Sequence, residues 1–302
     1  MTPPSAPTAA DPLNAHVADQ LDEVAALLEE QKANPFRVQA YRNAAATVRA
    51  LPRGVDDILD TEGLAGLVRL PTIGNSLARV IEQIATTGRL PMLERLRGQS
   101  DPIGRLASVP GIGPTLARRL HDELEIETLE QLERAAHDGT LRKVPGFGEK
   151  RIAAIRDVLA TRLGRRGSSA AVRERAGEPP VAELLDVDRE YRERSEAGTL
   201  PRIAPRRFNP TGERWLPVLH TSRGSRQYTA LFSNTPRAHE LGKTHDWVVI
   251  YFDDDRGVEG QRTVTTPATG PLRGKRVVRG REAESERYYA HERGEAPTAD
   301  TD

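Results

Sequence analysis

The sequence predicts a chain of two parts that differ in fold class: an all-α module of tandem hairpin motifs, followed by a small, mainly antiparallel β domain. Up to residue 162 the apolar residues recur at the spacing of amphipathic helices. Three short segments with the pattern Pro-x-x-Gly interrupt these helices about 35 to 39 residues apart, a period typical of repeated supersecondary units. After residue 199, short β-branched and aromatic runs separated by turn residues replace the helical pattern.

The helical half divides into two subdomains after a Pro- and Ala-rich start, residues 1–13, that we expect to be disordered. The first subdomain spans residues 14–98, and its apolar spacing predicts helices at 16–32, 36–51, 55–59, 64–70, 76–87 and 91–97. The second subdomain spans residues 99–163, with helices predicted at 103–107, from the second hairpin to residue 124, at 128–137 and at 149–162.

The second half begins with a segment rich in Gly, Ser, Arg and Pro, which predicts a linker over residues 164–200 with one helix at 181–196. The β-rich domain is expected at residues 201–290, and a disordered tail at 291–302. Its strands are predicted at 215–221, 227–233, 246–253 and 261–266.

Composition excludes several classes of chemistry. The chain has no cysteine, so it has no disulfide, no thiolate metal site and no cysteine nucleophile. Lys plus Arg equals Asp plus Glu at 44 each, so no overall field attracts nucleic acid, and any such binding depends on local geometry. No apolar run reaches membrane-spanning length and no signal pattern is present at the start, so we expect a cytoplasmic, nucleoid-associated protein.

The second hairpin segment runs Val109-Pro110-Gly111-Ile112-Gly113-Pro114-Thr115. Its glycines allow a tight turn, and the proline that follows is suited to the first position of a helix. The main-chain amides around Gly111, Ile112, Gly113 and Thr115 would then lie at a helix N-terminus, where they can hold a phosphate. Arg118 and Arg119, one turn later, can add charge-assisted contacts.

The pattern occurs twice more along the chain. The third segment, from Val144, supplies Gly146, Gly148 and Lys150, and the first, from Leu70, supplies Gly74 and Asn75 but has Thr72 in place of a glycine. Three such hairpins are suited to following a nucleic-acid backbone. The alternative is that they are helical packing corners that bind nothing.

These segments resemble the helix-hairpin-helix motif, which grips the nucleic-acid backbone without reading bases. A wider series resembles the N-terminal lyase and fingers regions of the family X DNA polymerases over residues 14–162. It comprises Asn34-Pro35-Phe36-Arg37, Ala40-Tyr41-Arg42, the first hairpin, Thr87-Gly88-Arg89-Leu90 and the second hairpin. The resemblance implies binding to gapped or nicked duplex DNA.

Several site residues follow from the resemblance alone. It places Arg37 and Tyr41 near the 5′ phosphate of a gap, Gly74 on the downstream duplex, and Gly111 and Gly113 on the primer side. It also implies a monovalent cation against the hairpin carbonyls of Val109 and Ile112.

The sequence differs from this family at the positions that carry the family's catalytic residues. The lysine of the lyase members corresponds to Val80, with Ser76 as the neighbouring basic position, and Lys32 is the one lysine of the first subdomain. Neither Val80 nor Ser76 supplies the amine that attacks a sugar aldehyde. The paired aspartates that bind the polymerase metals are also missing after the third hairpin. We therefore expect a protein without lyase or polymerase activity.

Three features of the second half attract attention, each with an ordinary explanation. Asp253-Asp254-Asp255 can bind Mg²⁺ or form a turn, and the turn is favoured because successive strand residues point to opposite faces. The histidines at 220, 239 and 245 lack ligand spacing. The basic stretch 272–281, with Arg202, Arg206 and Arg207, can contact phosphate or form a solvated edge strand.

The sequence as a whole predicts sequence-nonspecific binding to double-stranded DNA, gapped or nicked, in DNA repair. The expected partners are this DNA and repair proteins, with no membrane and no cofactor. Two alternatives remain: a lyase or nuclease with its chemistry in the β domain, and a protein-interaction module with degenerate hairpins.

Overall fold

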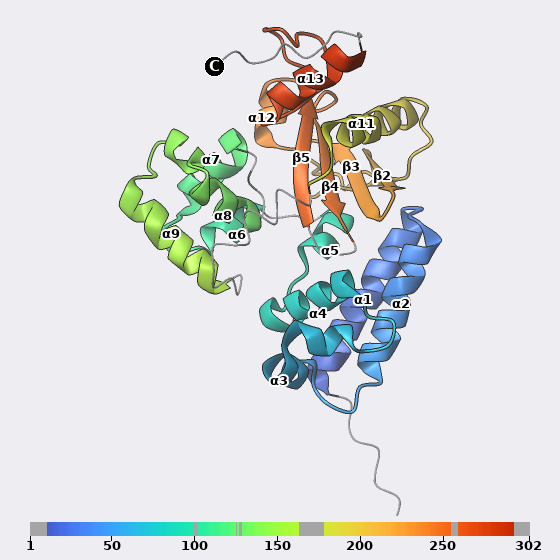
Figure 1. Ribbon diagram of the computed structural model, residues 1–302. Coiled ribbons are helices and arrows are strands. Elements are labelled where there is room, and N and C mark those ends of the chain that lie inside the picture. The colour runs from blue at the N-terminus through green and yellow to red at the C-terminus, as the bar shows by residue number, and fades with distance from the viewer. Residues whose placement is uncertain are drawn as a thin grey trace, which may run out of the picture. The chain divides into compact units, whose positions relative to one another are not determined.

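The computed structural model describes residues 11–98, 102–124, 126, 129–162, 178–254 and 259–292. The chain divides into two compact units (Figure 1). The first unit combines residues 1–99 with 180–232 and 248–302. The second unit contains residues 100–179 together with 233–247, a segment that separates two strands of the first unit.

The first unit starts with a helical module. Its helices are α1 (Pro12–Glu30), α2 (Pro35–Arg49), α3 (Val55–Val68), α4 (Asn75–Thr87) and α5 (Pro91–Leu96). The Asp11 carboxylate caps α1 by accepting the Leu13 amide at 2.8 Å. Side chains at helical spacing on α1, such as Leu21 and Leu28, are fully buried against α2 and α4. α3 is broken at Gly63, where φ is +63°, which explains why two short helices were predicted there.

The second part of this unit is a six-stranded antiparallel sheet in the order β1-β2-β3-β4-β5-β6, which confirms the predicted fold class. The strands are β1 (Arg202–Ile203), β2 (Leu216–Arg223), β3 (Arg226–Phe232), β4 (Val248–Asp253), β5 (Glu259–Thr265) and β6 (Val277–Val278). Tyr228 and Ala230 on β3 alternate with less buried residues and pack toward α11 (Val181–Glu196). The helix α13 (Glu282–Glu292) also packs on α11 and β6.

The predicted linker contains a helix that packs in the core of the sheet. α11 lies within it, and its apolar side chains Leu184, Val187 and Tyr191 are fully buried in the sheet's core. The sheet domain therefore begins near residue 180, before the predicted start at 201. Residues 163–177 of the predicted linker, and most of the predicted disordered leader and tail, lie outside the described residues.

The second unit contains the second and third hairpins. Its elements are α6 (Pro102–Ala107), α7 (Pro114–Leu124), α8 (Leu129–His137), the 3₁₀ helix η1 (Thr140–Lys143), α9 (Glu149–Arg162) and α12 (Pro236–Glu240). α12 comes from the segment between β3 and β4 and packs against α7. The apolar residue inside each turn, Ile112 and Phe147, is buried in one core with Leu106, Leu120 and Ile155.

Within the described ranges, no helix combines the length and the apolarity that a membrane crossing requires.

Candidate nucleic-acid interface

The three Pro-x-x-Gly segments form the same turn. In each, the amide of the buried apolar residue donates to the carbonyl of the apolar residue three positions earlier, at 3.3 Å for Ile73 to Leu70, 2.9 Å for Ile112 to Val109 and 3.3 Å for Phe147 to Val144. The second residue of each turn is proline, and the third has positive φ: Thr72 (+66°), Gly111 (+87°) and Gly146 (+103°). These are the features of a type II turn.

Each turn leads directly into a helix whose first residue is exposed: Asn75, Pro114 and Glu149. The carbonyls of Gly74, Gly113 and Gly148 accept the first helical hydrogen bonds, from Ala78, Ala117 and Ile152, at 2.9 to 3.0 Å. The amides at the start of a helix have no partner within that helix, so they remain available to a ligand. The three glycines are exposed, and a Cβ built on any of them would meet no atom within 4 Å.

The second hairpin carries the most favourable surroundings for an anion. Gly113 and Thr115 are exposed, and so is Arg118, for which no ion pair is seen among the described residues. The side chain of Ile112 is buried, so only its backbone can contribute to a site. The Val109 carbonyl accepts the turn hydrogen bond. A carbonyl oxygen has a second lone pair, which is available to a cation. The monovalent cation site that the resemblance implies stays a prediction.

The first hairpin keeps its shape although threonine replaces glycine. Thr72 adopts the left-handed conformation that glycine favours. Its hydroxyl lies 2.9 Å from that of Thr47, which also donates to the Pro71 carbonyl at 3.2 Å. This side-chain clamp offsets backbone strain at Thr72, and Gly74 and Asn75 remain exposed beside it. Thr47 belongs to α2, so this contact could not be predicted from the hairpin segment alone.

The third hairpin is held by hydrogen bonds and an ion pair with side chains of its own unit. The guanidinium of Arg119 donates to the Pro145 carbonyl at 3.0 Å, and Arg151 donates to the Gly146 carbonyl. Glu149 occupies the first position of α9, where it pairs with Arg142 at 2.7 Å. A carboxylate at this position competes with a phosphate for the same amides. Gly148 and Lys150 are exposed, so they stay candidate contacts, with weaker surroundings than those of the second hairpin.

Arg37 and Tyr41 lie within the first unit, where α2 faces the sheet. An Arg37 guanidinium nitrogen lies 3.0 Å from a carboxylate oxygen of Asp253 on β4, and the Arg37 side chain is only 11% exposed. The Tyr41 hydroxyl donates to the Met92 sulfur at 3.4 Å. Burial opposes the charge of Arg37, but Asp253 and Tyr41 together raise its pKa above the usual value. A 5′ phosphate would therefore have to displace Asp253 to reach Arg37.

Other residues singled out in the sequence also have internal roles. Val80, at the lyase position, packs against the core of the helical module. In the basic stretch 272–281, Lys275 stacks on the Tyr289 ring at 4.4 Å, and Arg281 pairs with Glu284. Asp255 lies outside the described residues; among the residues that are described, no group of three metal-ligating side chains can hold a metal ion.

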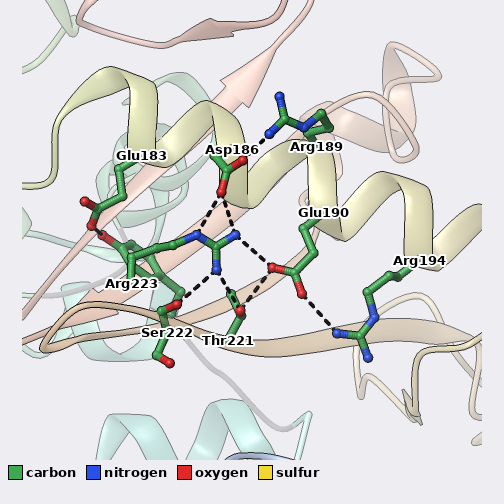
Figure 2. A network of polar contacts seen from close by, with 9 residues as sticks. Glu183, Asp186, Arg189, Glu190, Arg194, Thr221, Ser222 and Arg223 are labelled. Carbon is green, nitrogen blue, oxygen red and sulfur yellow. Dashed lines mark hydrogen bonds and ion pairs between the residues drawn. The ribbon is translucent and has the colours of Figure 1, made fainter.

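A network of ion pairs fastens α11 to the β2–β3 hairpin, which the sequence did not predict. Figure 2 shows the Arg223 guanidinium between Asp186 and Glu190, at 2.7 and 2.9 Å. Arg223 also donates to Thr221 at 2.9 Å, and Arg194 pairs with Glu190 at 3.0 Å (Figure 2). Asp186 and Glu190 of α11 thus hold the helix to the β2–β3 hairpin.

A polar bridge joins the helical module to the sheet within the first unit. The Gln31 side chain lies 2.9 Å from the His220 ring and donates to the Leu96 carbonyl at 2.8 Å, while the other ring nitrogen of His220 lies 3.0 Å from the Thr229 hydroxyl. Burial, with a contribution from the charge of Arg37, lowers the pKa of His220 to about 3. His220 is therefore neutral in the folded protein at neutral pH.

This bridge predicts a pH dependence of stability. Between about pH 6.5 and 3 the unfolded chain binds a proton at His220 that the folded chain does not, so the free energy of unfolding falls as the pH is lowered through this range. We expect the loss between pH 7 and 5 to reach up to about 2 kcal/mol. Urea unfolding of the wild type and of His220→Gln, which stays neutral, measures it. An equal pH dependence in both proteins would contradict this assignment.

Comparison with known proteins agrees with the geometry of the helical half. The family model described as "Helix-hairpin-helix domain" matches residues 12–90, and the one described as "SAM-like Helix-hairpin-helix tandem" matches residues 103–161. The DNA polymerase/3'-5' exonuclease PolX of Bacillus subtilis (strain 168) is 29% identical over 131 residues. The match covers 43% of this chain but only 22% of that protein. Together these similarities point to DNA binding, and the N-terminal half of this chain carries the helix-hairpin-helix regions of PolX-like proteins.

Proposed function

We propose that the chain binds duplex DNA without reading its base sequence, and that main-chain amides of the hairpins hold the phosphates. The observation that carries this proposal is the second hairpin, where Gly113 and Thr115 are exposed at the start of α7 and the exposed Arg118 follows one turn later. A helix N-terminus favours an anion, and a nearby guanidinium adds a charge-assisted contact. Gly74 with Asn75, and Gly148 with Lys150, are proposed as further contacts.

The charges of the helical module support a binding mode based on backbone amides. Four of its arginines, at positions 42, 49, 53 and 69, pair with carboxylates of the same module. Together with the zero net charge, this leaves little long-range attraction for DNA. Affinity then depends on close approach of the backbone, which exposed glycines permit.

We also propose a preference for gapped or nicked duplex in DNA repair. The first hairpin belongs to one compact unit, and the second and third belong to the other. An interrupted duplex bends easily at the break, so each unit can grip its own stretch of backbone. Such a protein would act in the cytoplasm at the nucleoid, beside the repair proteins that process the same DNA.

Binding to gapped, nicked, intact and single-stranded oligonucleotides, measured by fluorescence anisotropy at one fixed salt concentration, tests the proposal. We expect gapped and nicked duplex to bind about tenfold more tightly than intact duplex, a difference of about 1.4 kcal/mol. Fixed salt is essential because phosphate contacts make affinity strongly salt-dependent. Equal and weak binding to all four forms would exclude the function.

A further inference from the structure

Arg37, in the first turn of α2, takes its carboxylate partner from the sheet. Arg42, Arg49 and Arg69 pair with carboxylates of the helical module to which they belong. The partner of Arg37 is Asp253 at the end of β4, with 3.0 Å between a guanidinium nitrogen and a carboxylate oxygen. The charge of Arg37 is therefore neutralised by a strand that lies more than 200 residues away along the chain.

The same strand also covers a second arginine of the helical module. The guanidinium carbon of Arg95 lies 4.4 Å from the centre of the Tyr251 ring, which is a cation–π distance. Tyr251 and Asp253 are two positions apart on β4, so their side chains point to the same face of the sheet. β4 thus sets an aromatic ring against one arginine and a carboxylate against another. A nucleotide offers the same two groups, a base that stacks on a guanidinium and a phosphate that pairs with one.

The contact between the helical module and the sheet is largely polar. Among the described residues, the buried apolar cluster of the module and that of the sheet have no member in common. Besides the contacts of β4, the Gln31 side chain lies 2.9 Å from the His220 ring, and Arg214 pairs with Glu30 at 2.6 Å. The cavity between module and sheet is lined by side chains of both. Each part has a core of its own, so the two can separate without either unfolding.

We propose that β4 is an intramolecular inhibitor of DNA binding: Asp253 and Tyr251 occupy the place of a nucleotide on the helical module, and a terminal phosphate of gapped DNA binds Arg37 when the sheet moves away. This inference rests on the proposed DNA binding and adds its regulation. A tethered competitor acts at a high effective concentration, and the affinity for DNA falls with the fraction of molecules in the open state. A terminal phosphate carries more negative charge than a phosphodiester, so it is better suited to displace a carboxylate.

The variant Asp253→Asn tests this inhibition, with Asp186→Asn as its matched control. Both variants remove a carboxylate that pairs with an arginine and change the net charge equally, but the partner of Asp186 is Arg223 on β2 of the sheet. Anisotropy measures the affinity for gapped duplex with a 5′ phosphate or a 5′ hydroxyl at the gap. We expect Asp253→Asn to bind the phosphorylated gap about tenfold more tightly than the wild type, because the open state becomes more populated. Asp186→Asn should bind as the wild type does, and adding Arg37→Gln to Asp253→Asn should abolish the gain.

Glu30→Gln provides a second test at an exposed position, where loss of folding is not expected. This variant removes the ion pair with Arg214, whose side chains are both exposed, and leaves Arg37 and β4 intact. It should raise the affinity for the phosphorylated gap in the same direction but only about two- to threefold, since an exposed ion pair contributes little. Circular dichroism shows whether each variant is folded, and Glu30→Gln decides if Asp253→Asn is not.

The outcomes distinguish this inference from the proposed function. If the wild type binds gapped duplex but neither Asp253→Asn nor Glu30→Gln binds the phosphorylated gap more tightly, β4 does not inhibit binding and the hairpin assignment stands. An equal gain of Asp253→Asn for the phosphate and the hydroxyl would also overturn the inference, because a general change of charge would then explain it. If the wild type and all variants bind none of the DNA forms, the proposed function fails together with its regulation.

Discussion

Replacing Gly113 by aspartate is expected to weaken duplex binding by about two orders of magnitude without lowering the stability of the protein. The Gly113 carbonyl accepts the first hydrogen bond of α7, so this residue is the N-cap of the helix. An aspartate there accepts the amides of the first turn, which stabilises the helix by a few tenths of a kcal/mol relative to glycine. The same amides are then unavailable to a phosphate, and the carboxylate repels it.

The size of the effect follows from the bonds that are lost. A hydrogen bond to a charged group contributes about 1.5–3 kcal/mol, and 1.4 kcal/mol corresponds to a tenfold change in affinity. Anisotropy with intact and gapped duplex measures the affinity, and thermal unfolding measures the stability. Gly113→Asn, which caps without a charge, should lie between the wild type and Gly113→Asp. Undiminished binding by Gly113→Asp would show that phosphates do not approach this hairpin.

Aspartate at the corresponding glycine of each hairpin compares how much the three hairpins contribute to DNA binding. The carbonyls of Gly74 and Gly148 also accept the first hydrogen bond of their helices, and a Cβ built on either glycine would meet no atom within 4 Å. A smaller effect is expected for Gly148→Asp, because Glu149 already places a carboxylate at the start of α9. If Gly74→Asp weakens duplex binding nearly as much as Gly113→Asp does, the first hairpin also contacts a phosphate.

The hairpins could be predicted from sequence because their determinants are local. Within seven residues, Pro110 and Gly111 specify the turn, Gly113 and Pro114 specify the start of the helix, and Ile112 supplies the buried plug. The strands were predicted for the same reason, since alternation and turn residues lie within each hairpin. Short-range patterns therefore determine both halves of the fold class.

The polar contacts between distant segments could not be predicted in this way. Arg37 and Asp253 are 216 residues apart, and nothing near either residue indicates its partner. Arg276 belonged to a basic stretch that suggested phosphate binding, but in the structure it faces the carboxylate of Asp188 on α11. Local sequence shows that a side chain is charged; only the tertiary structure shows whether that charge is already neutralised.

The segment 181–196 illustrates the same difficulty for domain boundaries. A helix was predicted at these positions, but the Gly-, Ser-, Arg- and Pro-rich composition of the preceding residues placed that helix within a linker. In the structure Tyr191 is fully buried, and its hydroxyl accepts the Phe232 amide at 2.9 Å and donates to the Pro217 carbonyl at 3.1 Å. The acidic residues Asp186 and Glu190 lie at other positions of α11, where they pair with Arg223 (Figure 2).

Replacing Asp188 by alanine is expected to destabilise the protein by about 3–5 kcal/mol, the largest effect we anticipate on stability. The Asp188 side chain is only 1% exposed and makes two bonds with the Arg276 guanidinium, at 2.9 and 2.7 Å. Arg276 also donates to the Val264 carbonyl at 3.1 Å and to Thr266 at 2.9 Å, so the pair fastens α11 to β5. Without Asp188, a nearly buried guanidinium charge is left without its carboxylate.

Urea unfolding followed by tryptophan fluorescence measures this loss, and two further variants identify its cause. Asp186→Ala removes a more exposed acid whose partner Arg223 keeps Glu190, so it should cost less than about 1 kcal/mol. The double variant Asp188→Leu with Arg276→Met replaces the ion pair by apolar side chains and should recover most of the stability, because no unpaired charge remains buried. Equal losses of stability in Asp188→Ala and in the double variant would show that the loss comes from changed packing volume and not from the unpaired charge. The ion pair would then not be what fastens α11 to the sheet.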